Sequence, residues 1–158
     1  GQLGGFKQSS LMENGGNSYK VESFGGFANG GNSVPFNELE LYLMGLIPSS
    51  SVSEFDVFTD ITSFSSSGSE FNFSANSRIT HDGKSIENLL GKRIPISNNS
   101  QKNFKILIVV LTNKTLTDEQ WDKVDATAEW FSKKEDDGTH LYNFWEATNG
   151  IGSITIEN

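Results

Sequence analysis

The chain has 158 residues with 12 basic and 20 acidic side chains, a formal net charge of −8, two histidines and no cysteine. This length is sufficient for one domain with a hydrophobic core, whereas the absence of cysteine excludes disulfides and cysteine-based metal sites. The negative charge argues against nucleic acid as a partner, because phosphate binding requires clustered Lys and Arg side chains.

Residues 1–35 form a Gly- and Asn-rich arm, with nine glycines among the first 33 residues. Such a segment has too few apolar residues to build its own core, so we expect turns and short strands whose apolar side chains dock elsewhere. Residues 36–158 have the pattern of an α+β domain, and the alternative is one continuous domain. No stretch reaches the roughly 18–20 apolar residues that span a bilayer, so no membrane span is predicted.

A short helix is predicted over residues 37–46, where an asparagine suited to the N-cap precedes two acidic residues. Gly45 and then Pro48 end this helix, since proline cannot continue it. The side chains expected to be buried are those of Leu39, Tyr42, Leu43 and Leu46.

The serine-rich residues 49–53 and 63–69 predict loops that flank a short extended stretch. Alternating Phe side chains predict a half-buried strand or hairpin over residues 71–80. Residues 84–90 predict one or two helical turns closed by Gly91.

The apolar, β-branched run at about 104–112 predicts a central strand covered on both faces. A capping-box motif and apolar residues at helical spacing then predict a helix at about 117–134. A second helix at about 140–148 and an edge strand at 153–156 complete the pattern. The expected fold is therefore α+β: a mixed small sheet with a central apolar strand, packed by these helices and preceded by the arm.

Few residues in the sequence point to chemistry by themselves. Neither the zinc-binding HExxH motif nor the GxSxG nucleophile motif is present, and both His81 and His140 are expected in turns or at helix starts. Glu38 and Glu40 suit the N-terminal dipole of their helix, and Glu135–Asp137 suits a solvated acidic turn. Trp121, Trp130 and Trp145 are candidates for a carbohydrate platform, although Trp121 lies on the apolar stripe of its helix and is expected to pack in the core.

Several segments, spread over nearly the whole chain, resemble the part of secreted bacterial zincin-like metallopeptidases that follows their HExxH helix. The most specific is Glu40–Pro48 (ELYLMGLIP), which with the preceding Leu39 resembles a family segment of the form LELYLMGLIP. The other similar segments are Ser10–Asn14, Gly91–Pro95, Ser100–Lys105, Val109–Thr112 and Trp145–Gly150.

This resemblance implies two roles in the chain, each with two candidate residues. Glu40 corresponds to an acidic third zinc ligand, with Glu38 as the alternative, and Met44 or Met12 corresponds to a methionine beneath the zinc site. The resemblance thus identifies the chain as the C-terminal portion of a longer metallopeptidase, its parent protein. Zinc is then expected in the parent protein, with the upstream part of the same polypeptide as partner and a peptide or protein as substrate. The expected location is secreted or at the surface of a bacterial cell. Because HExxH supplies two ligands and the general base, this chain alone is not expected to be catalytic.

A different class of function is also consistent with the sequence. The chain contains no self-contained catalytic set of residues, which favours a non-enzymatic binding or adhesion module of an exported protein. In that case the exposed aromatic residues or the Gly-rich arm would contact a glycan or a protein. A purely structural module is the third alternative.

Overall fold

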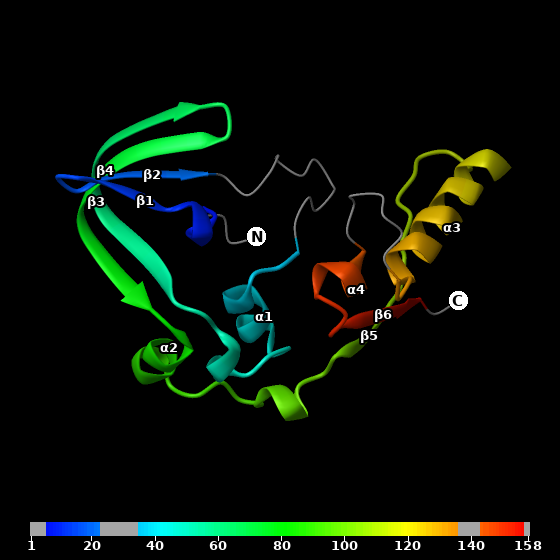
Figure 1. Cartoon of the computed structure of the whole chain (residues 1–158). Coiled ribbons are helices and arrows are strands. Elements are labelled where there is room, and N and C mark those ends of the chain that lie inside the picture. The colour runs from blue at the N-terminus through cyan, green and yellow to red at the C-terminus, as the bar shows by residue number, and fades with distance from the viewer. Residues whose placement is uncertain (1–5, 23–34, 136–142, 157–158) are drawn as a thin grey trace. The chain divides into compact units, whose positions relative to one another are not determined.

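The computed structural model describes residues 6–22, 35–135 and 143–156, which fall into two compact units (Figure 1). Of these residues, 6–22 and 36–100 belong to unit 1, whereas residue 35, 101–135 and 143–156 belong to unit 2. Both units contain helices and strands, which confirms the expected α+β class. The predicted boundary near residue 35 stays a prediction, because residues 23–34 lie outside the described residues.

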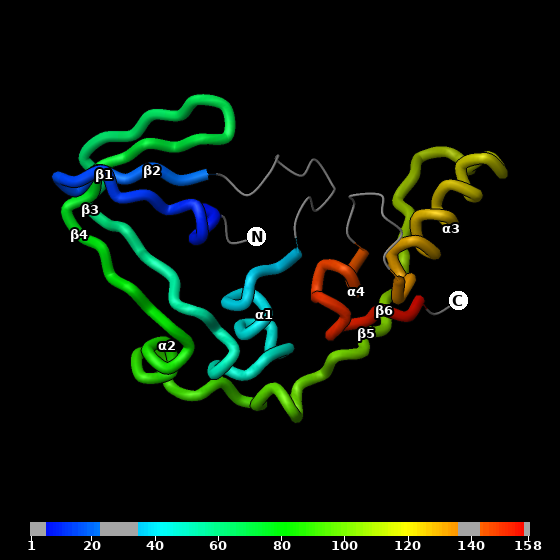
Figure 2. The backbone as a smooth tube through the Cα atoms, viewed as in Figure 1, coloured from blue at the N-terminus to red at the C-terminus, as the bar shows by residue number. Residues whose placement is uncertain are grey.

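Unit 1 is built on a four-stranded antiparallel sheet with the strand order β1-β2-β4-β3. The strands are β1 (Met12–Gly15), β2 (Ser18–Glu22), β3 (Phe55–Ser67) and β4 (Glu70–His81). Figure 1 shows β3 and β4 as one long, bent hairpin, and Figure 2 follows its backbone through the tight turn. The turn contains Gly68 with a φ of 60°, a conformation that glycine adopts without strain.

The hairpin corrects the prediction of a loop over residues 63–69. Ser63–Ser67 continues β3, and each of these residues pairs with one of residues 70–74 of β4. Serine has a weak intrinsic preference for strands, but the ladder of backbone hydrogen bonds does not depend on the side chain. A partner strand therefore overrides the local signal.

The core of unit 1 lies where β2 pairs with β4. Tyr19 and Val21 of β2 are only 5% and 2% exposed, and they lie opposite Phe73 and Phe71 of β4. Residues of the predicted arm thus dock on the hairpin, as expected. Phe58 joins this cluster from β3, with its ring centroid 4.6 Å from that of Tyr19.

The two α-helices in the described residues of unit 1 are α1 (Glu38–Met44) and α2 (Gly83–Leu90), both in predicted positions. Each begins with a capping box, in which an N-cap side chain and the N3 side chain satisfy each other's backbone N–H groups. The predicted burial of Leu43 is wrong, because its side chain is 47% exposed. Leu41 is buried in its place, together with Tyr42 and Leu46.

The described residues of unit 2 form a two-stranded parallel sheet and two helices. The strands are β5 (Asn103–Ile106) and β6 (Ser153–Ile156), and the helices are α3 (Asp118–Ser132) and α4 (Phe144–Ala147). Both helices contact β6. Thr117 and Gln120 form the capping box that the sequence predicted for α3.

The predicted central strand at about 104–112 is wrong in its length and its burial. Regular pairing ends at Ile106, opposite Ile156, and the side chains of Leu107, Val109 and Leu111 are 75%, 68% and 92% exposed. An apolar β-branched run needs a neighbouring strand to become a covered strand, and β6 is the only strand paired with β5 among the described residues.

The helices of unit 2 differ from expectation in detail. None of the residues of α3 is buried, and Trp121 and Phe131 on its apolar stripe are 46% and 37% exposed. Of the predicted helix at about 140–148, residues 144–147 form α4, whereas 140–142 lie outside the described residues. None of the helices in the described parts of the chain is both long enough and apolar enough to cross a membrane.

Candidate functional site

Glu40, the expected zinc ligand, lies in the first turn of α1 with only 5% of its surface exposed. Its Oε2 accepts a hydrogen bond from the backbone N–H of Asn37 at 2.9 Å, while Asn37 Oδ1 accepts one from Glu40 N at 2.8 Å. The backbone N–H of Ser53 donates a hydrogen bond to Glu38 Oε2, with 2.6 Å between nitrogen and oxygen. Both acidic residues therefore fix the start of α1 through backbone groups.

The two methionines of the predicted site lie in different elements. Met44 ends α1 one helical turn after Glu40, so the two side chains share a face of the helix. Met12 lies on β1 and is 58% exposed. The structure thus brings Glu40 and Met44 onto one face and places Met12 on the sheet.

A zinc site needs several donors, and Glu40 alone is one donor of a type that zinc accepts. Within residues 6–22, 35–135 and 143–156, no three His, Asp or Glu side chains lie close enough together to hold a metal ion. His140, Asp136 and Asp137 lie outside the described residues. The resemblance assigns the remaining zinc ligands to an upstream helix.

A serine and a histidine meet at the start of α2. Ser85 Oγ lies 3.4 Å from His81 Nδ1, but it also donates a hydrogen bond to the carbonyl of Asp82 at 2.8 Å. In addition, Ser85 Oγ accepts the backbone N–H of Asp82 at 2.8 Å. The single hydroxyl proton therefore has a closer acceptor than the imidazole, and the arrangement is a helix cap rather than a nucleophile with its base. The backbone N–H of Ser85 also lowers the pKa of Asp82.

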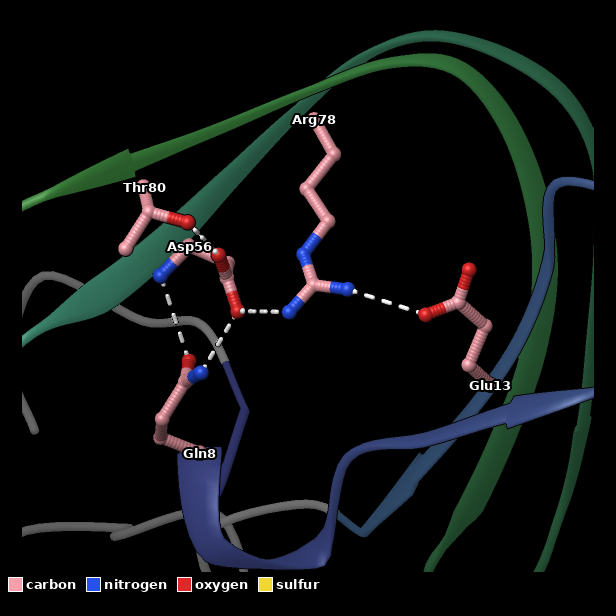
Figure 3. A network of polar contacts seen from close by, with 5 residues as sticks. All are labelled: Gln8, Glu13, Asp56, Arg78 and Thr80. Carbon is pink, nitrogen blue, oxygen red and sulfur yellow. Dashed lines mark hydrogen bonds and ion pairs between the residues drawn. The ribbon is translucent and has the colours of Figure 1, made fainter.

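A polar network ties the segment before β1 to the hairpin (Figure 3). At its centre is Asp56 of β3, whose side chain is 1% exposed. Asp56 Oδ2 accepts hydrogen bonds from Gln8 Nε2 at 2.6 Å and Arg78 Nη2 at 3.0 Å, and Oδ1 accepts one from Thr80 Oγ1 at 2.6 Å. Arg78 also reaches Glu13 of β1, with 3.2 Å between Nη1 and Oε2.

The network keeps Asp56 ionised. Burial by itself would raise the pKa of this carboxyl group, but the hydrogen bonds from Arg78, Thr80 and Gln8 outweigh burial and hold the pKa at about 2. A carboxylate with such a low pKa does not exchange protons near neutral pH. Asp56 therefore stabilises the contact between strands and is unsuited to general acid–base catalysis.

An open apolar groove of about 350 Å³ lies on unit 1, between residue 6 and strands β2, β3 and β4. Every lining side chain is aromatic or aliphatic: Phe6, Val21, Phe58, Ile61, Phe64, Phe71 and Phe73. The ring centroids of Phe64 and Phe71 lie 5.7 Å apart in a stacked arrangement, and those of Phe58 and Phe73 lie 5.0 Å apart. Concave apolar surfaces of this kind are typical of ligand sites.

Neither the network nor the groove has a signal in the sequence. Gln8 and Asp56 are 48 residues apart, and only the pairing of β3 with β4 and the position of residues 8–10 bring them together. The alternation of Phe71 and Phe73 predicts a half-buried strand, but it does not predict which side chains from β3 face them. Of the three tryptophans considered for a platform, Trp121 is exposed, while Trp130 and Trp145 are half-buried.

Comparisons of the chain with protein-family models, with curated proteins and with solved structures find no match. Proposals about its function therefore rest on the residues and the geometry described above.

Proposed function

We propose that this chain is the C-terminal part of a secreted bacterial zincin-like metallopeptidase and is not catalytic by itself. The observation that carries the proposal is the Glu40–Pro48 block, whose sequence resembles a segment of that family. In the first turn of α1, the buried Glu40 is the N3 residue of a capping box. In the parent protein, this carboxylate is the third zinc ligand, after two histidines of an upstream HExxH helix.

The contacts of α1 support a fixed position for Glu40. At the end of the helix, Gly45 adopts a left-handed conformation with a φ of 81°. Arg93 Nε donates to the carbonyl of Leu43 at 3.2 Å and Nη2 to that of Met44 at 3.3 Å. These hydrogen bonds satisfy helix carbonyls that have no partner within α1. A ligand needs such support, because a metal site tolerates errors of only about 0.5 Å in its donors.

Each part of the parent enzyme has a separate task under this proposal. Zinc supplies a Lewis acid for the scissile carbonyl and activates water when it is bound. This chain supplies one carboxylate and holds it, through Asn37 and Arg93, on a capped helix. The upstream part supplies the general base, and the substrate is a peptide or protein.

The first test is the sequence that precedes Gly1 in the gene. We expect an HExxH helix there, and a polypeptide that includes it should bind about one zinc ion and cleave peptides. The chain of 158 residues alone should do neither. An upstream sequence without any HExxH-like motif would refute the proposal.

The second test asks whether Glu40 is a ligand, using the longer polypeptide. In Glu40→Gln, the amide oxygen can still accept the N–H of Asn37, so the helix cap remains while the charged ligand is lost. The matched control is Glu146→Gln in α4, because Glu146 is also buried and accepts the N–H of its N-cap residue Asn143 at 2.8 Å. Zinc content, measured by atomic emission, should fall at least tenfold in the first variant and stay unchanged in the second. Equal zinc content in both variants would exclude Glu40 as the ligand.

A second candidate function is a non-enzymatic binding module of an exported protein, which the apolar groove favours. A groove lined by five Phe side chains is costly to expose, since apolar surface in water is unfavourable by roughly 25 cal/mol per Å². The same upstream sequence distinguishes the two functions, because a binding module needs no HExxH helix.

A further inference from the structure

We propose that Asn14 is a site of spontaneous covalent modification, where the Asn14–Gly15 dipeptide converts through a succinimide ring into aspartate and isoaspartate. The reaction needs water and no enzyme. It uses neither zinc nor Glu40, so it is independent of the proposed peptidase function. The sequence also contains Asn-Gly at residues 29–30, which lie outside the described residues, and at residues 149–150, where we expect a much slower reaction.

The chemistry needs a backbone that can fold back on the asparagine side chain. The nitrogen of Gly15 loses its proton and forms a bond to Cγ of Asn14, while the Cγ–Nδ2 bond breaks and ammonia leaves with that proton. Water then opens the ring. Cleavage of the new N–Cγ bond gives aspartate, whereas cleavage of the original peptide bond gives isoaspartate, in which the chain runs through Cβ and Cγ. Glycine favours ring closure because it has no Cβ to hinder the approach.

Asn14 lies in a bulge of β1, which is an outer strand of the sheet. Glu13 lies opposite Tyr19 and Gly15 lies opposite Ser18, so Asn14 has no residue opposite it on β2. All four residues of β1 are exposed. Gly15 and Ser18 form the last pair before the turn, and no atom of the described residues lies within 4 Å of a Cβ added to Gly15. Opening this pair displaces no buried side chain of β1, so it releases the Gly15 nitrogen at low cost.

The nitrogen of Gly150 is held more firmly. Its N–H donates to the carbonyl of Trp145 at 2.7 Å, at the end of α4. A Cβ added to Gly150 would lie 2.9 Å from Cζ2 of Trp145, so this glycine packs against the indole ring. The preceding Thr148 is 0% exposed, and its Oγ1 accepts the N–H of Gly152 at 2.9 Å. Attack on Asn149 therefore needs the end of α4 to open, although Asn149 itself is exposed.

Modification of Asn14 changes β1 in two ways. Either product places a new carboxylate beside Glu13, whose Oε2 lies 3.2 Å from Nη1 of Arg78. Isoaspartate also lengthens the backbone by a methylene group. Met12 and Glu13 then lose their register with β2 if Gly15 keeps its place. We expect the isoaspartate form to lose the pairing of residues 12–13 and to keep that of β3 with β4.

The experiment incubates the whole chain at mildly alkaline pH, which favours loss of the attacking amide proton. Peptide mass spectrometry follows the products, and electron-transfer fragmentation distinguishes isoaspartate from aspartate. In the folded chain, products should form at Asn14 at least about tenfold faster than at Asn149, which corresponds to about 1.4 kcal/mol in the free energy of local opening. In urea above the unfolding transition, the two rates should be nearly equal.

Three results would overturn the proposal. One is an equal rate at Asn14 and Asn149 in the folded chain, and another is a product at Asn14 that forms only in urea. The third is a rate difference that persists unchanged in urea, because the neighbouring side chains and not the fold would then cause it.

A variant tests the effect on β1. Asn14→Gln should form no product at position 14, because glutamine would have to close a larger ring, while the rate at Asn149 stays unchanged. After incubation, hydrogen exchange at Met12 and Glu13 should be faster in the unaltered chain than in Asn14→Gln. Equal exchange in the two chains, with isoaspartate present in the first, would refute the expected loss of pairing.

Discussion

Protonation of Asp56 is expected to lower the stability of unit 1 in acid. Its pKa is lowered to about 2 in the folded chain, from an ordinary value of 3.8. A carboxyl group with a lowered pKa stabilises the folded state at every pH above its pKa in the unfolded chain. This stabilisation is lost as the pH falls to its pKa in the folded chain. We therefore expect a contribution of roughly 2 kcal/mol near neutral pH, which disappears between about pH 4 and pH 2.

The measurement compares urea unfolding of the unaltered chain with that of Asp56→Asn over this pH range. At pH 7 the variant should be less stable by roughly 2 kcal/mol, and at pH 2 the two chains should be nearly equal. Asp60→Asn is the control, because Asp60 is exposed on the same strand and asparagine tolerates its positive φ of 54°. A difference for Asp56→Asn that is the same at pH 7 and pH 2 would contradict the assigned pKa.

Gly45 is required for two separate reasons, and a matched glycine separates them. Its φ of 81° is strained for any other L-residue, and an added Cβ would overlap the guanidinium group of Arg93. Gly15 has nearly the same φ, 82°, but no atom lies within 4 Å of the position of its added Cβ. We expect Gly15→Ala to cost about 1 kcal/mol from backbone strain, and Gly45→Ala to cost clearly more. Equal changes in the free energy of unfolding would show that Arg93 moves aside without cost.

At the scale of whole elements, the segment after β5 is the one that the sequence predicts least well. Leu107–Leu111 is apolar, β-branched in part, uncharged and largely exposed. Short segments with these properties promote aggregation when they are accessible. We expect Val109→Lys to raise the concentration at which the chain aggregates, measured by light scattering, without lowering the free energy of unfolding.

A control variant places the same charge at a buried position of β6, the strand that pairs with β5. Ile154 of β6 is 8% exposed, so Ile154→Lys should destabilise unit 2 and increase aggregation. If Val109→Lys destabilises the chain as strongly as Ile154→Lys, then Val109 is buried in solution, which contradicts the proposed role of this segment in aggregation.

Helices were predictable from the sequence because their signals are local. Asn37 and Thr117 each accept the backbone N–H three residues later, so the residues that define the start of a helix are neighbours in the chain. The length of β3 and the end of β5 depend instead on which strand lies beside them. For the same reason the resemblance singled out Glu40 on its helix, whereas no pattern pointed to Asp56, whose partners are Gln8 before β1 and two residues of β4.

At the scale of the whole molecule, the two units differ in the apolar residues that they bury. Of the ten buried apolar residues in the described parts of the chain, Ala147 and Ile154 belong to unit 2 and the other eight to unit 1. Burial of apolar surface is the main source of stability. We therefore expect unit 2 to unfold at a lower urea concentration than unit 1, so that unfolding is not a single two-state transition.

The position of the tryptophans makes this prediction simple to test. All three tryptophans of the sequence, at positions 121, 130 and 145, belong to unit 2. Their fluorescence reports the unfolding of unit 2, while hydrogen exchange at Tyr19, Val21 and Phe73 reports that of unit 1. Coincident midpoints from the two methods would mean that the units unfold together.

The parallel pairing of β5 and β6 has a consequence for synthesis of the chain on the ribosome. Asn103 pairs with Ser153, so 50 residues separate the two halves of the ladder. At about 5–20 residues per second, β5 emerges roughly 2 to 10 seconds before its partner has been made. Throughout this interval β5 has no partner strand and the exposed apolar segment follows it, whereas the β3–β4 hairpin is already complete. Nascent chains stalled before residue 150 should therefore bind chaperones through this region of unit 2.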